Sequence, residues 1–194
     1  MEISAPKPGR PRNPVLDRAI LSAAADQLGD RGYARMSLEA VASAAGTTVP
    51  SLRRRYASKA ELVAAVIGSL RVEEPPTDAP DPRDHALAIL RNLHDNLRAM
   101  PAMRILGSLL VEEVRHPELL ALFKVRLVEP RRALLRRALE AGGLGGTADP
   151  DVLTSMLVGS FYGRYVTVAG VPDDWPERVL APIWPPAGAT VTHR

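Results

Sequence analysis

Residues 47–56 gather the side chains of this sequence that are best suited to bind an anion. The run TTVPSLRRRY has hydroxyl groups at its beginning and three consecutive arginines near its end. Arginine can bind guanine bidentately in the DNA major groove or neutralise phosphate, and hydroxyl groups at a helix start can meet phosphate oxygens. This chemistry favours recognition of a nucleic acid. A solvated basic helix face is the alternative explanation.

Other patterns of reactive residues in the sequence are incomplete. The chain has no cysteine, which excludes disulfides, thiolate metal sites and cysteine nucleophiles. Glu113 and His116 have the Glu-x-x-His spacing of di-iron bundles, but a second such motif and the additional carboxylates are missing. The nucleophile elbow and the two glycine-rich phosphate-binding motifs are missing as well. We therefore expect no catalysis, no metal and no cofactor.

The elements that must position the arginines have the pattern of two short helices joined by a turn. Ser37 is a suitable N-cap, and apolar residues follow it at helical spacing as far as Gly46. The second helix begins after Thr48, and small side chains in the first helix let the two cross closely. Leu52 can fill the angle between them. A helix–turn–helix of this size is a DNA-binding motif.

Helical spacing of apolar residues continues on both sides of this pair. Asn13 and Pro14 suit the start of a helix that Gly32 would end. The run Ser58–Glu61 matches a capping box and predicts a fourth helix. Prolines and glycines delimit the later helices, with a kink expected at Pro130 because proline lacks an amide donor. The later helices are expected near 83–100, 102–115, 117–141, 150–169 and 174–183.

Charge and proline content divide the chain into two parts. Residues 1–72 carry 11 Lys and Arg against 6 Asp and Glu, a net charge of +5, whereas the remainder carries 14 against 16, a net of −2. The proline-rich stretch 73–82 interrupts any helix between them. No stretch alternates with the period of a strand. We expect an all-α protein with a basic domain at 1–72, a helical domain at 83–184 and a disordered tail at 185–194.

The sequence predicts a protein that stays away from membranes. No run of about 18 apolar residues occurs, which excludes a membrane-spanning helix. Residues 1–13 lack the apolar core of a secretory signal. We therefore expect a cytoplasmic protein, a location that the absence of cysteine also fits.

Residues 15–67 resemble the DNA-binding domain of the TetR family of bacterial transcriptional repressors. Where that family usually has an aromatic residue directly after Leu52, this sequence has Arg53, which could replace or redirect the phosphate contact made there. The run 134–184 resembles one subgroup of the family's effector domains. The residues that carry the first resemblance are Ile20, Ala23, Ala24, Leu28, Gly32, Tyr33, Ser37, Leu38, Val41, Ala42, Ala45, Gly46, Ser51, Leu52, Tyr56, Ser58, Lys59, Glu61 and Leu62.

The resemblance implies a ligand-responsive repressor that binds a palindromic operator as a homodimer. The second helix of the pair would enter the groove, and residues at helix ends would hold the DNA backbone. The arm that carries Arg10 and Arg12 either follows a groove or makes no contact. The predicted DNA-binding residues are Ser37, Thr47, Thr48, Pro50, Ser51, Arg53, Arg54, Arg55, Tyr56 and Lys59.

The resemblance also implies a cavity in the second domain for a small apolar or amphipathic effector. His94 and Arg126 are polar residues that could face this cavity, with core packing or solvent exposure as the alternatives. The predicted pocket residues are Leu93, His94, Leu97, Met103, Leu106, Phe123, Arg126 and Phe161.

The last two long helices of the family form its dimer, which places the expected interface within 150–183. Gly159 and Gly163 lie four residues apart and allow two helices to approach closely. The predicted interface residues are Met156, Gly159, Gly163 and Trp175. The alternative function for the chain is a helical adaptor whose basic face binds a protein or an anionic surface.

Overall fold

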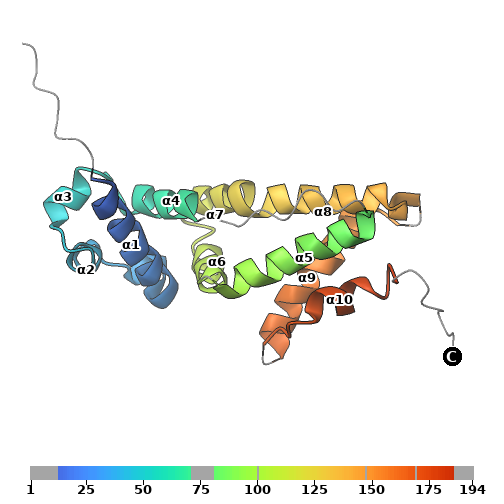
Figure 1. Ribbon diagram of the computed structural model, residues 1–194. Coiled ribbons are helices and arrows are strands. Elements are labelled where there is room, and N and C mark those ends of the chain that lie inside the picture. Colours follow the sequence, from blue (N-terminus) through green and yellow to red (C-terminus); the bar gives the residue numbers. More distant parts are fainter. Residues whose placement is uncertain (1–12, 71–80, 100, 147, 169, 186–194) are drawn as a thin grey trace, which may run out of the picture. The chain divides into compact units, whose positions relative to one another are not determined.

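The computed structural model describes residues 13–70, 81–99, 101–146, 148–168 and 170–185. All regular elements in these ranges are helices, which confirms the all-α class (Figure 1). The predicted linker 73–82 and tail 185–194 lie almost wholly outside the described residues, as do Arg10 and Arg12. The helices are α1 Pro14–Arg35, α2 Leu38–Ala44, α3 Val49–Arg53, α4 Lys59–Ser69, α5 Pro82–Ala99, α6 Ala102–Val111, α7 Pro117–Phe123, the π-helix Lys124–Val128, α8 Glu129–Ala141, the 3₁₀ turn Leu144–Gly146, α9 Pro150–Thr167 and α10 Trp175–Leu180.

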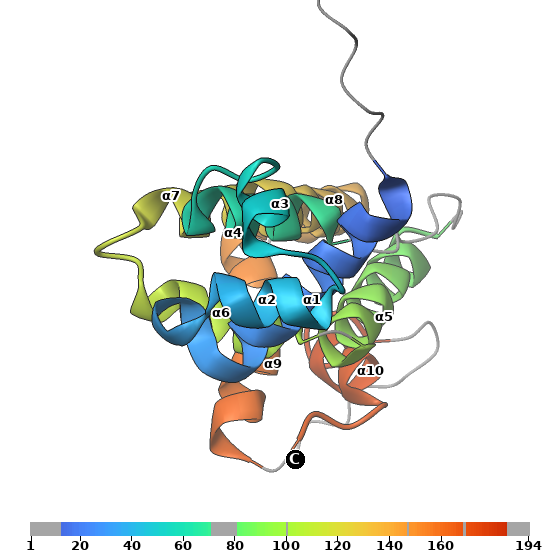
Figure 2. The same ribbon diagram turned by 90° about the vertical axis from the view of Figure 1, so that its left-hand side faces the viewer.

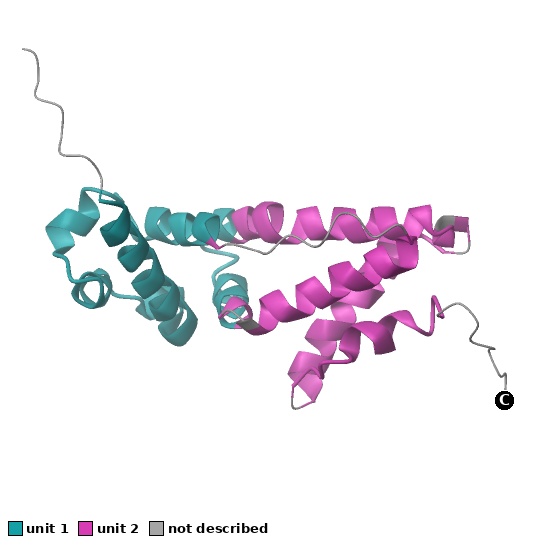
Figure 3. Cartoon of the chain, in the orientation of Figure 1, with its two compact units in different colours: residues 1–69, 104–119 teal, residues 70–103, 120–194 magenta. Residues whose placement is uncertain are grey.

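The chain forms two compact units, coloured separately in Figure 3. Unit 1 comprises Met1–Ser69 together with Arg104–Leu119, and unit 2 comprises Leu70–Met103 together with Leu120–Arg194. Residues 104–119, which we had expected in the second domain, therefore group with the helix-turn-helix. None of the described helices combines the length and apolar character that a membrane crossing requires.

Unit 1 has its core where α1 packs against α2 and α4. The largest apolar side chains of this core, among them Ile20, Leu28, Leu52 and Leu62, are fully buried. Burial of such side chains stabilises a fold by roughly 1.5–3 kcal/mol each. The predicted end of the first helix at Gly32 appears as an interruption in α1, where glycine has φ 74° and ψ 166°, a conformation that other residues rarely adopt.

Side-chain caps begin the helices of unit 1 where the sequence predicts them. The Asn13 Oδ1 accepts from the Val15 amide at 3.0 Å, and the Ser37 Oγ accepts from the Ala40 amide at 3.2 Å. The Ser58 Oγ accepts from the Glu61 amide at 3.0 Å. The reciprocal half of this capping box is shifted by one residue, because the Glu61 carboxylate accepts from the amide of Ala57.

The part of α6 in unit 1 is fastened to α1. The Ser108 hydroxyl donates to the Leu28 carbonyl at 2.9 Å, and Arg104 forms an ion pair with Asp30. After α6, the His116 ring lies against the Tyr33 ring with 4.5 Å between the centroids. Because the polar contacts and the ring contact join α1 and 104–119, these two segments belong to one compact unit with the helix-turn-helix.

Unit 2 is built on α5, α8, α9 and α10, which share one apolar core. The helix expected over 117–141 is irregular before Pro130, where the π-helix Lys124–Val128 immediately precedes α8. Proline has no amide to donate and its ring clashes with the preceding turn, so the wider π-turn accommodates it. The π-helix also changes which residues of the continuing helix face the core.

Candidate nucleic-acid interface and ligand pocket

The turn between α2 and α3 fixes the angle of the helix-turn-helix. Gly46 has φ 63°, its amide donates to the Ser43 carbonyl at 3.1 Å, and the Thr47 amide donates to the Ala42 carbonyl at 2.9 Å. This pair of hydrogen bonds closes α2, and a side chain at position 46 would be strained in the left-handed region. Figures 1 and 2 show α3 following α2 across this short turn. The Leu52 side chain is fully buried and anchors α3 to the core of unit 1.

The outward side of α3 carries the exposed part of the predicted DNA-binding set. Thr48, Pro50, Arg53 and Arg54 are exposed, and Ser51 and Thr47 are partly exposed. Thr48 is the N-cap of α3, since its hydroxyl accepts from the Ser51 amide at 3.3 Å. We call Thr48, Pro50, Arg53 and Arg54 the recognition face. The recognition face therefore combines two exposed guanidinium groups with the N-terminal end of α3.

Arg55 does not belong to this face. Its Nε donates to the Asp17 carboxylate of α1 at 2.8 Å, and its Nη1 donates to the Ser51 hydroxyl at 3.0 Å. Only about a fifth of its side chain is exposed. The prediction that all three arginines face DNA therefore needs correction, because Arg55 is held between α1 and α3 and fixes the position of the recognition helix.

Lys59 also differs from its predicted role. Its ammonium group donates to the carbonyls of Tyr33, Ala34 and Met36 at 2.7, 3.2 and 3.4 Å, and it lies 4.6 Å from the centre of the Tyr33 ring. A cation at the C-terminal end of a helix satisfies the last carbonyls and complements the helix dipole. Lys59 thus caps α1, and its ammonium group is hydrogen-bonded to carbonyl oxygens of unit 1.

The remaining predicted backbone contacts lie at the ends of helices. Ser37 caps α2 and its hydroxyl also donates to the Glu39 carboxylate at 2.8 Å. The pKa of Glu39 is lowered, first by hydrogen bonds from its own amide and from Ser37, and also by the charge of Arg53. Tyr56 is partly buried directly after α3. Arg53 therefore lies within electrostatic reach of α2 as well as on the recognition face.

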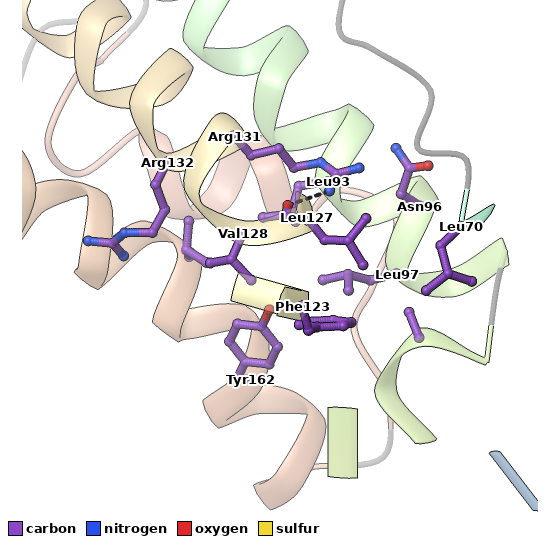
Figure 4. A pocket seen from close by; sticks show the side chains of 12 residues that line it. Leu70, Leu93, Asn96, Leu97, Phe123, Leu127, Val128, Arg131, Arg132 and Tyr162 are labelled. Atoms are coloured by element: carbon purple, nitrogen blue, oxygen red, sulfur yellow. Dashed lines mark hydrogen bonds between the residues drawn. The ribbon is translucent and has the colours of Figure 1, made fainter. Parts of the chain in front are cut away.

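Unit 2 contains a cavity of about 50 Å³ with largely apolar walls, shown in Figure 4. Three of the predicted pocket residues, Leu93, Leu97 and Phe123, line it. The sequence did not single out two of its polar residues, Arg131 and Tyr162. The complete lining is Leu70, Leu93, Asn96, Leu97, Ala102, Phe123, Leu127, Val128, Arg131, Arg132, Val158 and Tyr162.

The other predicted pocket residues lie elsewhere. His94 and Phe161 are buried in the core, where their rings pack against each other and against Trp175. Met103 packs on that core without lining the cavity, and Leu106 belongs to unit 1. Arg126 is exposed within the π-helix. The position of Arg131 follows from that π-helix, which a regular helical register through 117–141 does not anticipate.

Of the predicted dimer residues, those of α9 are exposed, whereas Trp175 is buried. Met156 is 60% exposed, and a Cβ added to Gly159 or Gly163 would meet no atom within 4 Å. Trp175 needs correction, because it is 4% exposed and its indole Nε1 donates to the Ser160 hydroxyl at 3.0 Å within unit 2. A continuous stripe at helical spacing remains exposed on α9. We call it the α9 apolar face, and its residues are Val152, Met156, Gly159, Gly163 and Val166.

Both parts of the chain match known families. Residues 20–66 match bacterial regulatory proteins of the tetR family, and residues 76–183 match the tetracyclin repressor-like C-terminal domain. An uncharacterised HTH-type transcriptional regulator of Mycobacterium tuberculosis is 31% identical over 170 residues, which are 83% of this chain and 79% of that protein.

Solved structures share the fold. A TetR-family regulator from a Rhodococcus species is similar with a TM-score of 0.66 and 20% identity, over 87% of this chain and 96% of the other. The flavonoid-responsive regulator FrrA is similar with a TM-score of 0.58 and 20% identity, over 85% of this chain and 91% of its own. The arrangement of a helix-turn-helix followed by a helical bundle is therefore common to all of these proteins.

Proposed function

The chain belongs to the TetR family of bacterial transcriptional regulators, and we propose that it is a homodimeric repressor that leaves its operator when a small molecule binds in unit 2. The observation that carries this proposal is the difference among the three arginines at the end of α3. Arg55 is fixed to Asp17, whereas Arg53, the last residue of α3, and Arg54, its C-cap, are exposed. Side chains that contact DNA from a recognition helix have to be exposed, as Arg53 and Arg54 are.

The recognition face supplies both kinds of DNA contact. Arg53 or Arg54 can donate bidentately to a guanine in the major groove, and the Thr48 hydroxyl at the start of α3 can donate to a phosphate. Arg53 occupies the position where the family usually has an aromatic residue, so it adds a charged donor at this point. Ser37 and Tyr56, at the ends of neighbouring helices, are the proposed backbone contacts on either side.

The α9 apolar face is the proposed dimer interface. It exposes Met156 and two valines, and Gly159 and Gly163 leave the backbone open to a partner helix. A second copy of the same helix could pack against this stripe at close range, which suits the self-complementary surface of a two-fold dimer. Two recognition helices related by that axis would reach successive major grooves, about 34–36 Å apart.

The cavity of unit 2 is the proposed effector site. Leu70, which directly follows α4 in the sequence, and Ala102, the first residue of α6, both line it. A molecule in the cavity therefore contacts unit 2 at the residue that follows α4 and at the first residue of α6. FrrA, the flavonoid-responsive relative, is a precedent for small-molecule control on this fold. Binding lowers operator affinity if the effector prefers the conformation that does not fit DNA.

The proposed function is tested by selecting the operator from genomic fragments and measuring binding to it. The full chain should bind the selected palindrome at least a thousandfold more tightly than a scrambled duplex at the same salt concentration. Equal affinity for both duplexes would contradict the proposal and would instead favour a purely electrostatic basic surface.

The effector site has its own test. Leu97→Trp should fill the cavity and abolish release from the operator by the natural inducer, while operator affinity stays within about threefold of the original protein. Leu97 is chosen because its side chain lines the cavity, whereas that of Leu106, also predicted as a pocket residue, does not. Retention of full induction by the variant would place the effector elsewhere.

A further inference from the structure

The cavity of unit 2 contains a guanidinium group whose binding edge is unused. Arg131, in the first turns of α8, lines the cavity, and its Nη1 donates to the Leu127 carbonyl at 2.8 Å. Its Nε and Nη2 are buried and have no hydrogen-bond partner among the residues that the structure describes. These two nitrogens carry the parallel N–H bonds that arginine uses to bind a carboxylate bidentately. The unused donors therefore match the geometry of one particular kind of ligand group.

The surroundings of Arg131 make this arrangement unfavourable without a ligand. The wall near its side chain consists mainly of Leu93, Leu97, Leu127 and Phe123 (Figure 4). Burial lowers the pKa of Arg131, and the polar neighbour that partly offsets this effect is the Tyr162 hydroxyl, whose own pKa is raised by burial. Donors that have lost water and gained no partner typically cost about 1–3 kcal/mol each. An anionic ligand would recover that energy.

The neighbouring arginine provides a contrast within the same cavity. Arg132 also lines it, but its Nη2 donates to the Asp151 carboxylate at 2.8 Å and to the Ser155 hydroxyl at 2.9 Å. Figure 4 shows the two arginine side chains running in different directions from the start of α8. Arg132 is thus paired with a carboxylate, whereas Arg131 is held only by the Leu127 carbonyl and keeps two buried donors that a bound molecule would have to reach by a small rearrangement of the wall.

We propose that the effector is a compact apolar molecule with a carboxylate group, which binds side-on to the Nε and Nη2 of Arg131 while its apolar part lies among the leucines and Phe123. Tyr162 also lines the cavity and offers its hydroxyl as a second polar group to the ligand. This inference rests on the proposed effector site and adds its chemical class. Because the cavity holds only about 50 Å³, a larger acid must widen it.

Matched acids and amides test the charge requirement. Binding of benzoate, hexanoate, benzamide and hexanamide to the full chain would be measured by isothermal titration at pH 7. The acids should bind at least tenfold more tightly than the amides of the same size, because only the acids pair with the guanidinium. Equal binding of acids and amides, or no binding of either acid at millimolar concentration, would overturn the proposal.

Two variants assign the effect to one side chain. Arg131→Met should remove the preference for acids, whereas Arg132→Met, on the same cavity, should retain it. Thermal unfolding separates a ligand-binding role from a structural one. Arg131→Met should unfold at the same or a higher temperature, because it removes unpaired buried donors. A marked loss of stability, beyond that of the one hydrogen bond to the Leu127 carbonyl, would show that Arg131 supports the fold and would overturn the proposal.

The operator distinguishes failure of this inference from failure of the proposed function. An acid that binds through Arg131 without weakening operator binding would uphold the carboxylate site and contradict the ligand-responsive role. Release of the operator by the natural inducer with undiminished potency in Arg131→Met would overturn the carboxylate site and leave the ligand-responsive role intact.

Discussion

The two units of this regulator use their partly buried cations in opposite ways. In unit 1, Arg55 and Lys59 find their partners within the protein, on the carboxylate of Asp17 and on three carbonyls at the end of α1. In unit 2, Arg131 is also partly buried, and two of its donors have no partner among the described residues. Burial of a cation therefore does not reveal its role. Arg131 differs from Arg55 and Lys59 in that it combines unpaired donors with a place in the wall of a cavity.

The difference follows from what each unit has to recognise. DNA is a large exposed polyanion, so unit 1 can bind it with solvated arginines and use the remaining cations to fix the helices that carry them. A small effector offers few atoms, and its charge has to be met inside a cavity where water is excluded. The predictions below disturb one of these arrangements at a time.

The largest effect is expected from the core beneath the recognition helix. Leu52→Ala removes a fully buried side chain that anchors α3, and such truncations destabilise proteins by about 2–5 kcal/mol. Chemical denaturation should show this loss, and operator binding should fall with it. A variant of unchanged stability would show that α3 is held mainly by the Arg55–Asp17 contact.

The next effect concerns Lys59 and separates a cap from a phosphate contact. Lys59→Met should destabilise unit 1 by about 1–3 kcal/mol, because three carbonyls lose a charged donor. Residual DNA binding should keep the same dependence on salt. A decrease of the salt slope by about one, with unchanged stability, would instead indicate that the ammonium neutralises a phosphate.

A comparable effect is expected at the α9 apolar face, where the proposed dimer forms. Met156→Glu places a charge in the middle of the stripe and should raise the dimer dissociation constant at least tenfold, which corresponds to about 1.4 kcal/mol. Val15→Glu is a matched control, because Val15 is a 66% exposed apolar residue of α1, in the other unit. Sedimentation would measure both, and equal dimer strength in the two variants would contradict the interface.

Local sequence determined much of this fold. The sequence predicts caps at Asn13, Ser37 and Ser58, because their side-chain oxygens can accept hydrogen bonds from free amides at a helix start. Each of the three accepts such a hydrogen bond. Gly32 and Pro130 marked the interruption in α1 and the irregular turn before α8, since both effects arise within a few residues. The helical class followed from spacing alone.

The sites were less predictable, because long side chains take partners that are distant in sequence. Arg55 pairs with a residue 38 positions away and Lys59 with one 26 positions away, so composition made both look like DNA contacts. In unit 2 the π-helix placed Arg131 at the cavity and left Arg126 exposed. Trp175 looked like an interface anchor because it is large, but packing against Phe161 and His94 buries it.

The central claim is that Arg53 and Arg54 bind DNA while Arg55 positions them. The most direct measurement compares alanine variants of these three residues for both thermal unfolding and operator affinity. Arg53→Ala and Arg54→Ala should each lose about 1–3 kcal/mol of operator binding with an unchanged unfolding temperature, whereas Arg55→Ala should lower the unfolding temperature as well. Full operator affinity in the first two variants, or a loss confined to DNA binding in Arg55→Ala, would contradict this account.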